Sequence, residues 1–534
     1  MTRKGWLTAV ACLWLMGTVQ AREQASAKRE FRGVWMHTVY SNLFKNLTTA
    51  EIKDTLTKQL DLLAEDGCNA LLFQVRPEAD AFYVSHYEPW SRFLTGTQGK
   101  SPDPFFDPME FLIEECHRRG MEFHAWINPY RANSNTANPL YDNHPYHNKR
   151  YLFIHYGKSL YYNPGVPENR AHICNVVKDI VTRYDVDAIH MDDYFYPYPL
   201  RGLPFPDNDT FKRYGMNNGY EVSQKDDWRR DNVNRLIHEL SDVIKQQTTW
   251  VRFGISPFGI YRNAAQSPDG SRTNGMSCYD QLYADILLWM RNHWIDYVIP
   301  QLYWEIGHPQ ADYETLLKWW DDHAVEGVNL YIGQDVNRSR RQFEQKWAME
   351  DSCRHVSGNC YWSADALLQN KQGAGEKVAR HNRQPVLTPT YPWLDSIPPY
   401  APFNLRMDLM GPEPLLRWDA GDEPGELDKV SGYVVYGFYP EEPFDLNRAD
   451  RILAVTTAKQ MVLPDDIDAL CRFYVVTTLD RMHNESKGSI PYQYSESDVT
   501  DEEIFDFENT TTDDPSEEAD TAPSEKEIPK TNEP

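Results

Sequence analysis

The sequence contains no CxxC or HxH spacing, no glycine-rich loop behind its first predicted strand, and no long apolar run after residue 21. The missing Cys and His spacings are those of common zinc sites, so we expect no metal and no cofactor. Without a later apolar run, the rest of the chain offers no candidate membrane-spanning helix.

Basic residues are also scarce, with 54 Lys and Arg against 79 Asp and Glu. This balance argues against a nucleic-acid partner or an anionic membrane surface.

The acidic excess is concentrated at the C-terminal end of the chain. The last 35 residues contain 13 Asp and Glu against two Lys, and so contribute −11 to the formal net charge of −25. The chain before them is therefore only moderately acidic. Residues 500–534 are rich in Thr, Glu, Asp, Pro and Ser and have too few apolar side chains for a core. We predict that they form a disordered tail.

The first 21 residues have the pattern of a secretion signal. Arg3 and Lys4 precede an apolar run over residues 6–16, and residues 19–21 provide a cleavage site with small side chains. We therefore expect an exported protein, located in the periplasm or outside the cell. An alternative is a lipoprotein attached through Cys12, which follows Ala-Val-Ala.

The cysteines do not predict a disulfide framework. Removal of Cys12 with the signal leaves seven scattered cysteines, and an odd number cannot form a closed set of bridges. Cys353 and Cys360 are close enough in sequence for a local disulfide. We expect most of the others to be small buried hydrophobic residues.

Residues 22–395 show a repeated pattern of a short apolar run, a polar loop and a longer amphipathic stretch. Eight runs read as strands: 31–38, 70–76, 122–129, 186–194, 251–258, 297–304, 328–333 and 359–363. Between them, helices are predicted over 51–64, 108–119, 170–184, 228–246, 279–293 and 312–324. Eight strands alternating with helices indicate a (β/α)8 TIM barrel. A doubly wound open sheet is the competing fold, and it usually carries a glycine-rich loop after its first strand.

The pattern changes after a proline-rich linker over residues 397–402. Short alternating runs follow at 415–418, 432–437 and 473–478, separated by turn residues. This spacing predicts a small all-β sandwich over residues 396–499. Its single early Trp418 and its two Tyr-Val-Val runs resemble a fibronectin type III module.

The predicted strand over residues 186–194 ends in two adjacent carboxylates followed by aromatic residues. Strand side chains alternate between faces, so Ile189 and Met191 should face the helices while His190 and Asp192 face the barrel interior. An isolated Asp-Asp pair is commonly just a turn at a strand end. Here the neighbouring strands supply further polar groups at the same end of the barrel, where barrel enzymes place their active sites.

The same alternation predicts a converging polar set at this end. Its members are His37, Gln74, Arg76, His124, Asn128, His190, Asp192, Tyr303 and Glu305, ringed by Trp35, Trp126, Tyr194, Tyr196, Trp304 and Trp362. Any one of them could be structural, but buried polar groups are costly unless satisfied. Carboxylates, amides and flat rings together suit a sugar, which offers hydroxyl groups and an apolar ring face.

Cleavage of a glycosidic bond needs one protonated and one ionised carboxyl group. Asp192 and Glu305 are the best pair by strand position. We predict that Asp192 is the ionised partner, kept charged by His190 and Arg76. Glu305 would be the acid, with a pKa raised by Tyr303 and Trp304. Asp193 could replace either carboxylate.

Six motifs in order resemble the glycosyl hydrolase-like 10 family. They are EFRGVW at 30–35, FQVRP at 73–77 with DAFY at 80–83, AWINPYR at 125–131, DAIHMDDY at 187–194, GISPFG at 254–259 and PQLYW at 300–304. The resemblance covers residues 29–393. It implies an exported bacterial TIM barrel distantly similar to α-amylases, often with a fibronectin-like module. It also implies activity on glycans, for some members on peptidoglycan strands stripped of their peptides.

The α-amylase pattern would place an Asp after the fourth strand, as Asp192 is, and a Glu after the fifth. Here the fifth strand ends in Ser256-Pro257-Phe258, without an acid.

The leading hypothesis is a secreted glycoside hydrolase acting on peptide-free cell-wall glycan. Three alternatives stay open at this point. The substrate could be an imported plant or host polysaccharide, or the barrel could be a carbohydrate-binding protein without catalysis. The third is a metal-dependent hydrolase using His37, His124, His190 and Asp192.

Overall fold

The computed structural model describes residues 27–494, apart from 42, 45, 409–412, 422–424, 426 and 464–471. The predicted secretion signal, Cys12 and the acidic tail therefore lie outside the described residues. Everything described below belongs to one compact unit that ends at Tyr494.

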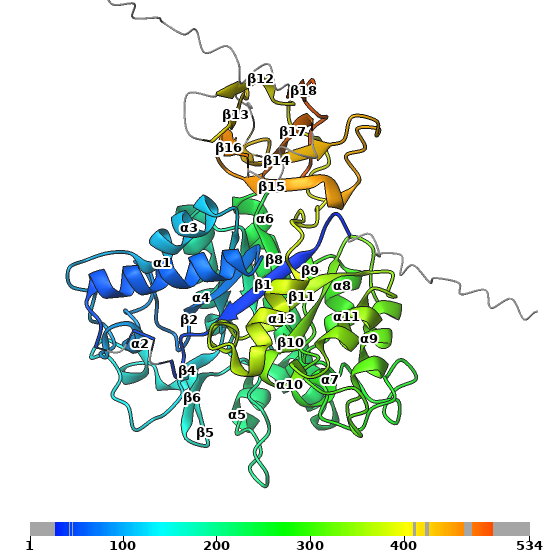
Figure 1. The fold of residues 1–534 in the computed structure, drawn as a ribbon. Helices are drawn as coiled ribbons and strands as arrows, with labels where there is room; N and C mark the ends of the chain where they lie inside the picture. The colour runs from blue at the N-terminus through cyan, green and yellow to red at the C-terminus, as the bar shows by residue number, and fades with distance from the viewer. Residues whose placement is uncertain are drawn as a thin grey trace, which may run out of the picture. The chain divides into compact units, whose positions relative to one another are not determined.

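Eight parallel strands close into a barrel (Figure 1). They are β1 (Phe31–Met36), β2 (Ala70–Arg76), β3 (Glu122–Ile127), β7 (Ala188–Met191), β8 (Arg252–Ile255), β9 (Tyr297–Val298), β10 (Asn329–Asp335) and β11 (Val356–Trp362). Each pairs with the next in this order, and β11 pairs with β1, where Gly33 lies opposite Cys360. The prediction of a TIM barrel from eight alternating runs is confirmed.

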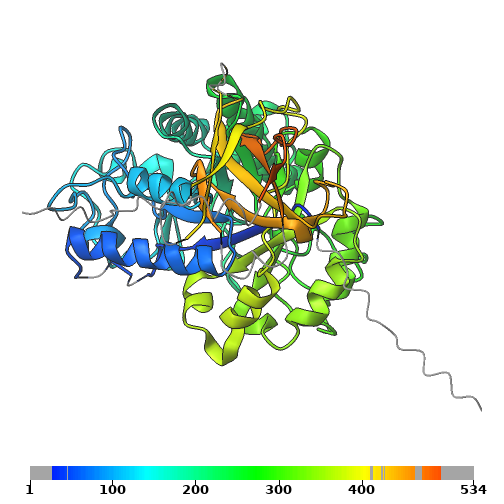
Figure 2. The ribbon, with the colours of Figure 1, turned by 45° about the horizontal axis from the view of Figure 1, so that its top comes forward.

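Helices surround the barrel in both ribbon views (Figures 1 and 2). The longer ones are α1 (Thr49–Glu65), α3 (Pro108–Arg118), α4 (Pro167–Arg183), α6 (Lys225–Gln247), α8 (Ile286–Arg291), α9 (Tyr313–Asp322), α11 (Phe343–Glu350) and α13 (Ala374–His381). Shorter ones include α2 (Arg92–Thr95), α5 (Asn208–Thr210), α7 (Cys278–Gln281), α10 (Val336–Ser339) and α12 (Ala364–Leu368). The predicted helix over 279–293 is divided into α7 and α8.

Helix α1 illustrates how local sequence sets these elements. Thr48 and Glu51 form a reciprocal capping box that satisfies the first backbone N–H groups. The buried residues Ile52, Leu56, Leu60 and Leu63 recur at helical spacing and face the barrel. Just past the helix end, Gly67 has φ +76°, a left-handed conformation that is easiest for glycine.

The strands divide the apolar core into two layers, as their alternation predicts. Phe73, Val75, Ile189 and Met191 belong to the outer layer between strands and helices. The inner layer fills the barrel with side chains such as Trp35, Leu72, Trp126, Ala188, Tyr297, Tyr331 and Cys360. Alternate residues of one strand can therefore carry polar groups inward, while the residues between them anchor the strand to its helices.

An insertion after β3 forms a small antiparallel sheet that the sequence did not predict. It contains β4 (Arg131–Asn133), β5 (Phe153–Tyr156) and β6 (Ser159–Tyr162), in the order β4-β6-β5. Its first strand starts four residues after the end of β3 and brings Arg131 to the same end of the barrel as Asn128.

The C-terminal region forms two antiparallel sheets. One contains β12 (Phe403–Asp408), β13 (Leu415–Asp419) and β16 (Gln460–Val462); the other contains β14 (Val430–Phe438), β15 (Ile452–Thr456), β17 (Phe473–Asp480) and β18 (Tyr492–Gln493). Trp418 of the first sheet packs with Tyr433, Val435 and Val476 of the second in a shared core. The all-β prediction is confirmed. The relation to fibronectin type III modules and the domain boundaries stay predictions.

Two further sequence expectations can be compared with the structure. Cys353 and Cys360 are both free thiols, so the suggested disulfide is wrong. Cys360 points into the barrel with the inner layer, whereas Cys353 packs near the end of α11, on the helix side.

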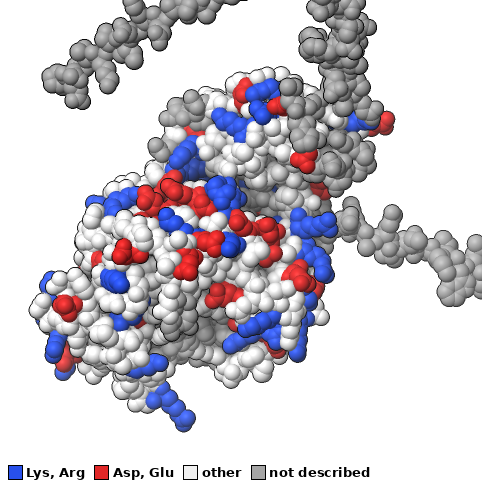
Figure 3. Space-filling model, turned by 60° about the vertical axis from the view of Figure 1, so that its left-hand side comes forward, with Lys and Arg blue, Asp and Glu red and all other residues white. Residues whose placement is uncertain are grey.

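No helix among the described residues is long and apolar enough to cross a membrane. On the face shown in Figure 3, acidic and basic side chains are interspersed.

Candidate functional site

A pocket of about 310 Å³ opens at the C-terminal ends of the barrel strands. Aromatic rings form most of its wall, and two consecutive aspartates project into it. Its lining residues are Trp35, Trp126, Asp192, Asp193, Tyr194, Tyr198, Ser256, Phe258, Gln301, Tyr303, Trp304, Arg338 and Trp362. Strand-end segments of at least six barrel strands thus converge on one cavity, as expected of a TIM-barrel site.

Asp192 follows β7 and is held by three N–H donors. Trp126 Nε1 donates to Oδ2 at 3.2 Å, while Asn128 Nδ2 and the Tyr194 backbone N–H donate to Oδ1 at 3.3 and 3.1 Å. Burial raises the pKa of Asp192, and the nearby Arg131 guanidinium and these donors oppose that rise. Because N–H groups can only donate, both oxygens are arranged to accept, which favours the ionised form.

Asn128 links this arrangement to the inserted sheet. Its side-chain oxygen accepts from the Arg131 backbone N–H at 2.9 Å, which fixes its amide nitrogen toward Asp192. The Arg131 guanidinium lies 4.9 Å from the centre of the Tyr194 ring. The turn from β3 into β4 therefore places both an amide donor and a positive charge beside Asp192.

Asp193 has a different environment. It is 2% exposed, and burial, reinforced by the charge of Asp192, raises its pKa to about 7. Hydrogen bonds from Tyr198 and Gln301 partly oppose the rise. The two neighbouring carboxyl groups therefore differ: Asp192 is surrounded by N–H donors, and Asp193 keeps its proton up to about neutral pH. A difference of this kind between two neighbouring carboxyl groups is what acid–base catalysis requires.

The structure contradicts the proposal that Arg76 and His190 keep Asp192 charged. Arg76 is completely buried and forms an ion pair with Glu88, which is also buried. It also donates to the backbone carbonyls of Asn128 and Pro129, so it supports the loop below the pocket. Burial holds the pKa of His190 well below its usual value, so this imidazole is neutral.

Glu305, the predicted acid, lies outside the pocket. Tyr303 and Trp304 do line it, but Glu305 is exposed. Strand alternation cannot be extended this far, because β9 ends at Val298 and the backbone then passes through Pro300 and a single bridge at Gln301. The second carboxyl group that lines the pocket beside Asp192 is Asp193.

Four other predicted residues have structural partners instead of a place in the pocket wall. Gln74 accepts from the backbone N–H groups of Thr38 and Val39 and so fixes the loop after β1. His37 packs against the Trp362 ring, with 5.2 Å between ring centres. His124 and His190 lie deeper in the barrel, where both hydrogen-bond to the Tyr297 hydroxyl.

Within the described part of the chain, no group of three His, Cys, Asp or Glu side chains could hold a metal ion.

Part of the pocket wall differs from the residues predicted for it. Tyr196 was expected in the aromatic ring but is buried against Phe205 and Tyr283. Tyr198, two residues further on, lines the pocket instead. Arg338 comes from α10, and no sequence pattern indicated it. Ser256 and Phe258 lie in the GISPFG motif, which was a usable signal.

The chain is similar in sequence to a known family and to curated proteins. A model of the family described as glycosyl hydrolase-like 10 matches residues 30–349. Glycosyl hydrolase YngK of Bacillus subtilis (strain 168) is 39% identical over 488 residues, covering 87% of this chain and 93% of the relative. Glycosyl hydrolase DigH of Escherichia coli (strain K12) is 35% identical over 328 residues, covering 58% and 73%.

Among solved structures, the chain is similar to the PgaB (BpsB) glycoside hydrolase domain from Bordetella bronchiseptica. The TM-score is 0.43 at 12% sequence identity, over 66% of this chain and 98% of that one. The catalytic domain of β-amylase from Paenibacillus polymyxa gives 0.44 at 12% identity, with the same two coverages. On the family match and the curated relatives, the chain belongs to the glycosyl hydrolase-like 10 family and is a glycoside hydrolase.

Proposed function

We propose that this glycoside hydrolase cleaves glycosidic bonds in peptide-free strands of bacterial cell-wall glycan. The observation that carries the proposal is the buried Asp192–Asp193 pair in a pocket walled by aromatic rings. Asp193 is the proton donor to the leaving oxygen, and Asp192 is the ionised carboxylate that acts as nucleophile or activates water.

The pocket wall supports a sugar as substrate. Trp35, Trp126, Trp304 and Trp362 offer flat apolar surfaces, on which the apolar faces of sugar rings can stack. Gln301 and Arg338 add polar groups that can contact hydroxyl or carbonyl oxygens. A volume of about 310 Å³ is at the small end of the range for ligand pockets, which leaves little room for attached peptides.

The choice of cell-wall glycan also rests on the family resemblance and on the N-terminal signal pattern. Cell-wall glycan lies outside the cytoplasm, so a hydrolase acting on it must be exported. We further propose that the two C-terminal sheets form a fibronectin type III-like module, because a three-stranded and a four-stranded sheet share one core around Trp418.

The test uses the purified protein with two substrates, intact peptidoglycan and amidase-treated strands that lack peptides. The protein should release sugar-only fragments from the stripped strands, identified by mass spectrometry, and Asp192→Asn should reduce that release by about 10²-fold or more. Glu305→Gln is the matched control and should retain activity, because Glu305 is exposed outside the pocket. Release from neither substrate, but from a plant or host polysaccharide, would overturn the substrate assignment.

Tyr198→Phe should move the pH dependence of the reaction. The Tyr198 hydroxyl donates to Asp193 Oδ2 and lowers its pKa, so its removal raises that pKa further. Since Asp193 must be protonated to act as the acid, the alkaline limb of the kcat/KM profile should move upward. One lost hydrogen bond corresponds to about one pH unit. A profile that stays in place, or moves to lower pH, would contradict Asp193 as the acid.

A further inference from the structure

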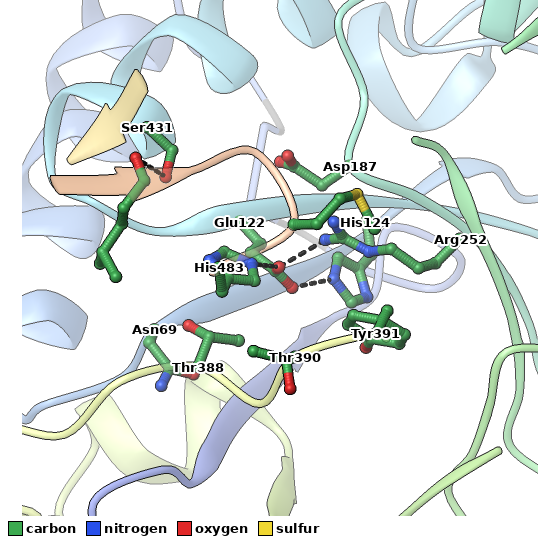
Figure 4. A network of polar contacts seen from close by, with 12 residues as sticks. Asn69, Glu122, His124, Asp187, Arg252, Thr388, Thr390, Tyr391, Ser431 and His483 are labelled. Carbon is green, nitrogen blue, oxygen red and sulfur yellow. Dashed lines mark hydrogen bonds and ion pairs between the residues drawn. The ribbon is translucent and has the colours of Figure 1, made fainter. Parts of the chain in front are cut away.

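An unbroken series of hydrogen bonds runs through the barrel interior, from the C-terminal region to the catalytic pocket. We call it the interior chain, and its members in order are His483, Glu122, His124, Tyr297, His190 and Trp35. Figure 4 shows its first part, where the Glu122 carboxylate lies between His483, His124 and Arg252. The last member, Trp35, lines the pocket.

Each contact in the interior chain has hydrogen-bond geometry. His483 Nε2 contacts Glu122 Oε1, and His124 Nε2 lies 2.7 Å from Glu122 Oε2. The Tyr297 hydroxyl is 2.8 Å from His124 Nδ1 and 3.1 Å from His190 Nδ1. Trp35 Nε1 is 3.2 Å from His190 Nε2. The five members from Glu122 to Trp35 are each at most 4% exposed.

The two ends of the interior chain fix the position of every proton between them. An indole N–H can only donate, so His190 Nε2 accepts from Trp35 and the His190 proton is on Nδ1. That proton is donated to the Tyr297 oxygen, and the Tyr297 hydroxyl donates to His124 Nδ1. His124 then carries its proton on Nε2 and donates it to the Glu122 carboxylate.

The pKa shifts of Glu122 and His190 agree with hydrogen-bond donation from Trp35 toward Glu122. Burial by itself would raise the pKa of Glu122, but Arg252, His483 and the hydrogen bonds from both histidines hold it well below its usual value. Glu122 is therefore an ionised acceptor. Burial, together with the nearby His124, holds the pKa of His190 well below its usual value, so this imidazole is neutral.

The C-terminal region reaches the barrel through a loop after β17. Asp480 Oδ1 accepts from the backbone N–H groups of Met482 and Asn484, at 2.8 and 2.9 Å, and so shapes the loop. Met482 is completely buried in the inner layer of the barrel. The neighbouring His483, whose side chain is 12% exposed, contacts Glu122 at the N-terminal end of β3. The loop therefore closes the end of the barrel opposite the pocket.

We propose that the interior chain positions Trp35 in the catalytic pocket, with His483 as its contribution from the C-terminal region. The Trp35 ring packs edge-on against Tyr303 and Trp362, each with 6.4 Å between ring centres, and both of these also line the pocket. A buried N–H without an acceptor is costly, so the His190 acceptor selects one orientation of the indole. The C-terminal region is then part of the hydrolase rather than a spacer. The activity arm of the test rests on the proposed function.

The first test is independent of activity. In the full-length protein labelled with ¹⁵N-histidine, His190 should be the tautomer with its proton on Nδ1, and His124 the tautomer with its proton on Nε2. The signals are assigned by comparison with His190→Gln and His124→Gln. An Nε2–H tautomer at His190 would overturn the direction of the interior chain, whether or not the glycan substrate is correct.

The second test compares two buried tyrosines in the kinetics of glycan hydrolysis. Tyr297→Phe breaks the interior chain. We expect KM to rise about tenfold, the equivalent of one hydrogen bond, and kcat to stay within about twofold of the wild-type value. Tyr331→Phe is the matched control: Tyr331 is also completely buried in the inner layer, but its hydroxyl contacts Tyr391 and Asn329. Equal KM values for the two variants would overturn the proposal.

The third test examines the His483 end. His483→Ala should raise KM in the same direction as Tyr297→Phe, and His483→Gln should restore it, because a Gln amide can still donate to Glu122. An unchanged KM in His483→Ala would remove His483 from the interior chain. If the wild-type protein cleaves none of the glycans, the proposed function fails, and the tautomer measurement still decides the interior chain.

Discussion

Asp193→Asn should lower kcat on natural glycan by about 10²–10⁴-fold, the usual contribution of a general acid. The Asn side chain has nearly the same shape and can still accept from Tyr198, but it has no proton of suitable acidity to give to the leaving oxygen. The loss should shrink strongly on an aryl glycoside whose leaving group needs no protonation. Equal losses on both substrates would show that Asp193 is not the proton donor.

The same substitution is expected not to weaken the fold, which separates this loss from unfolding. The folded-state pKa of Asp193 is about 7, raised from 3.8 by burial and by Asp192. The wild-type protein therefore loses stability as pH rises from about 4 through 7, whereas Asn remains neutral. The variant should be more stable at pH 8, by at most about 4 kcal/mol, and equal to the wild type near pH 3. Urea unfolding at the two pH values measures the difference.

The strand pattern predicted the barrel and much of the site because alternation in a strand is a strict geometric rule. It placed Trp126, His190 and Asp192 on the inner side. Trp126 and Asp192 line the pocket, and His190 lies deeper in the barrel. The rule applies only while the chain remains a strand. Tyr196 and Glu305 lie well beyond the ends of β7 and β9. Both were predicted to be in the site, and in the structure both lie outside it.

Long-range charge pairing was the second limit of the sequence. A strand-end arginine can point into the pocket or toward a loop, and alternation does not distinguish the two. Arg76 pairs with Glu88, twelve residues further along the chain, and with no carboxylate of the pocket. His124 and His190 were correctly placed inside the barrel, yet their partner Tyr297 comes from a different strand, so their role as a hydrogen-bonded pair had no local signal.

Glu88→Gln should lower the free energy of unfolding by about 3–5 kcal/mol at pH 7, because it leaves the Arg76 charge buried without a counter-ion. The two side chains are 0% and 2% exposed, and Glu88 also contacts His172 Nε2 at 3.0 Å. Burial alone would raise the pKa of Glu88, but Arg76 and His172 lower it to about 2.

The pH dependence of this effect has a definite sign. A carboxylate whose folded-state pKa is depressed contributes stability above its unfolded pKa of about 4.5, and that stability is lost as pH falls toward 2. The difference in unfolding free energy between Glu88→Gln and wild type should therefore be largest near pH 7 and should shrink in acid.

Asp54→Asn is the matched control. The Asp54 and Lys58 side chains of this ion pair are 62% and 70% exposed, so its loss should lower the unfolding free energy by less than about 1 kcal/mol. Because Arg76 also donates to the carbonyl of Asn128, whose amide contacts Asp192, the Glu88 variant should lose activity before it unfolds globally. Equal unfolding free energies for the Glu88 and Asp54 variants would mean that Arg76 is not held by its buried partner.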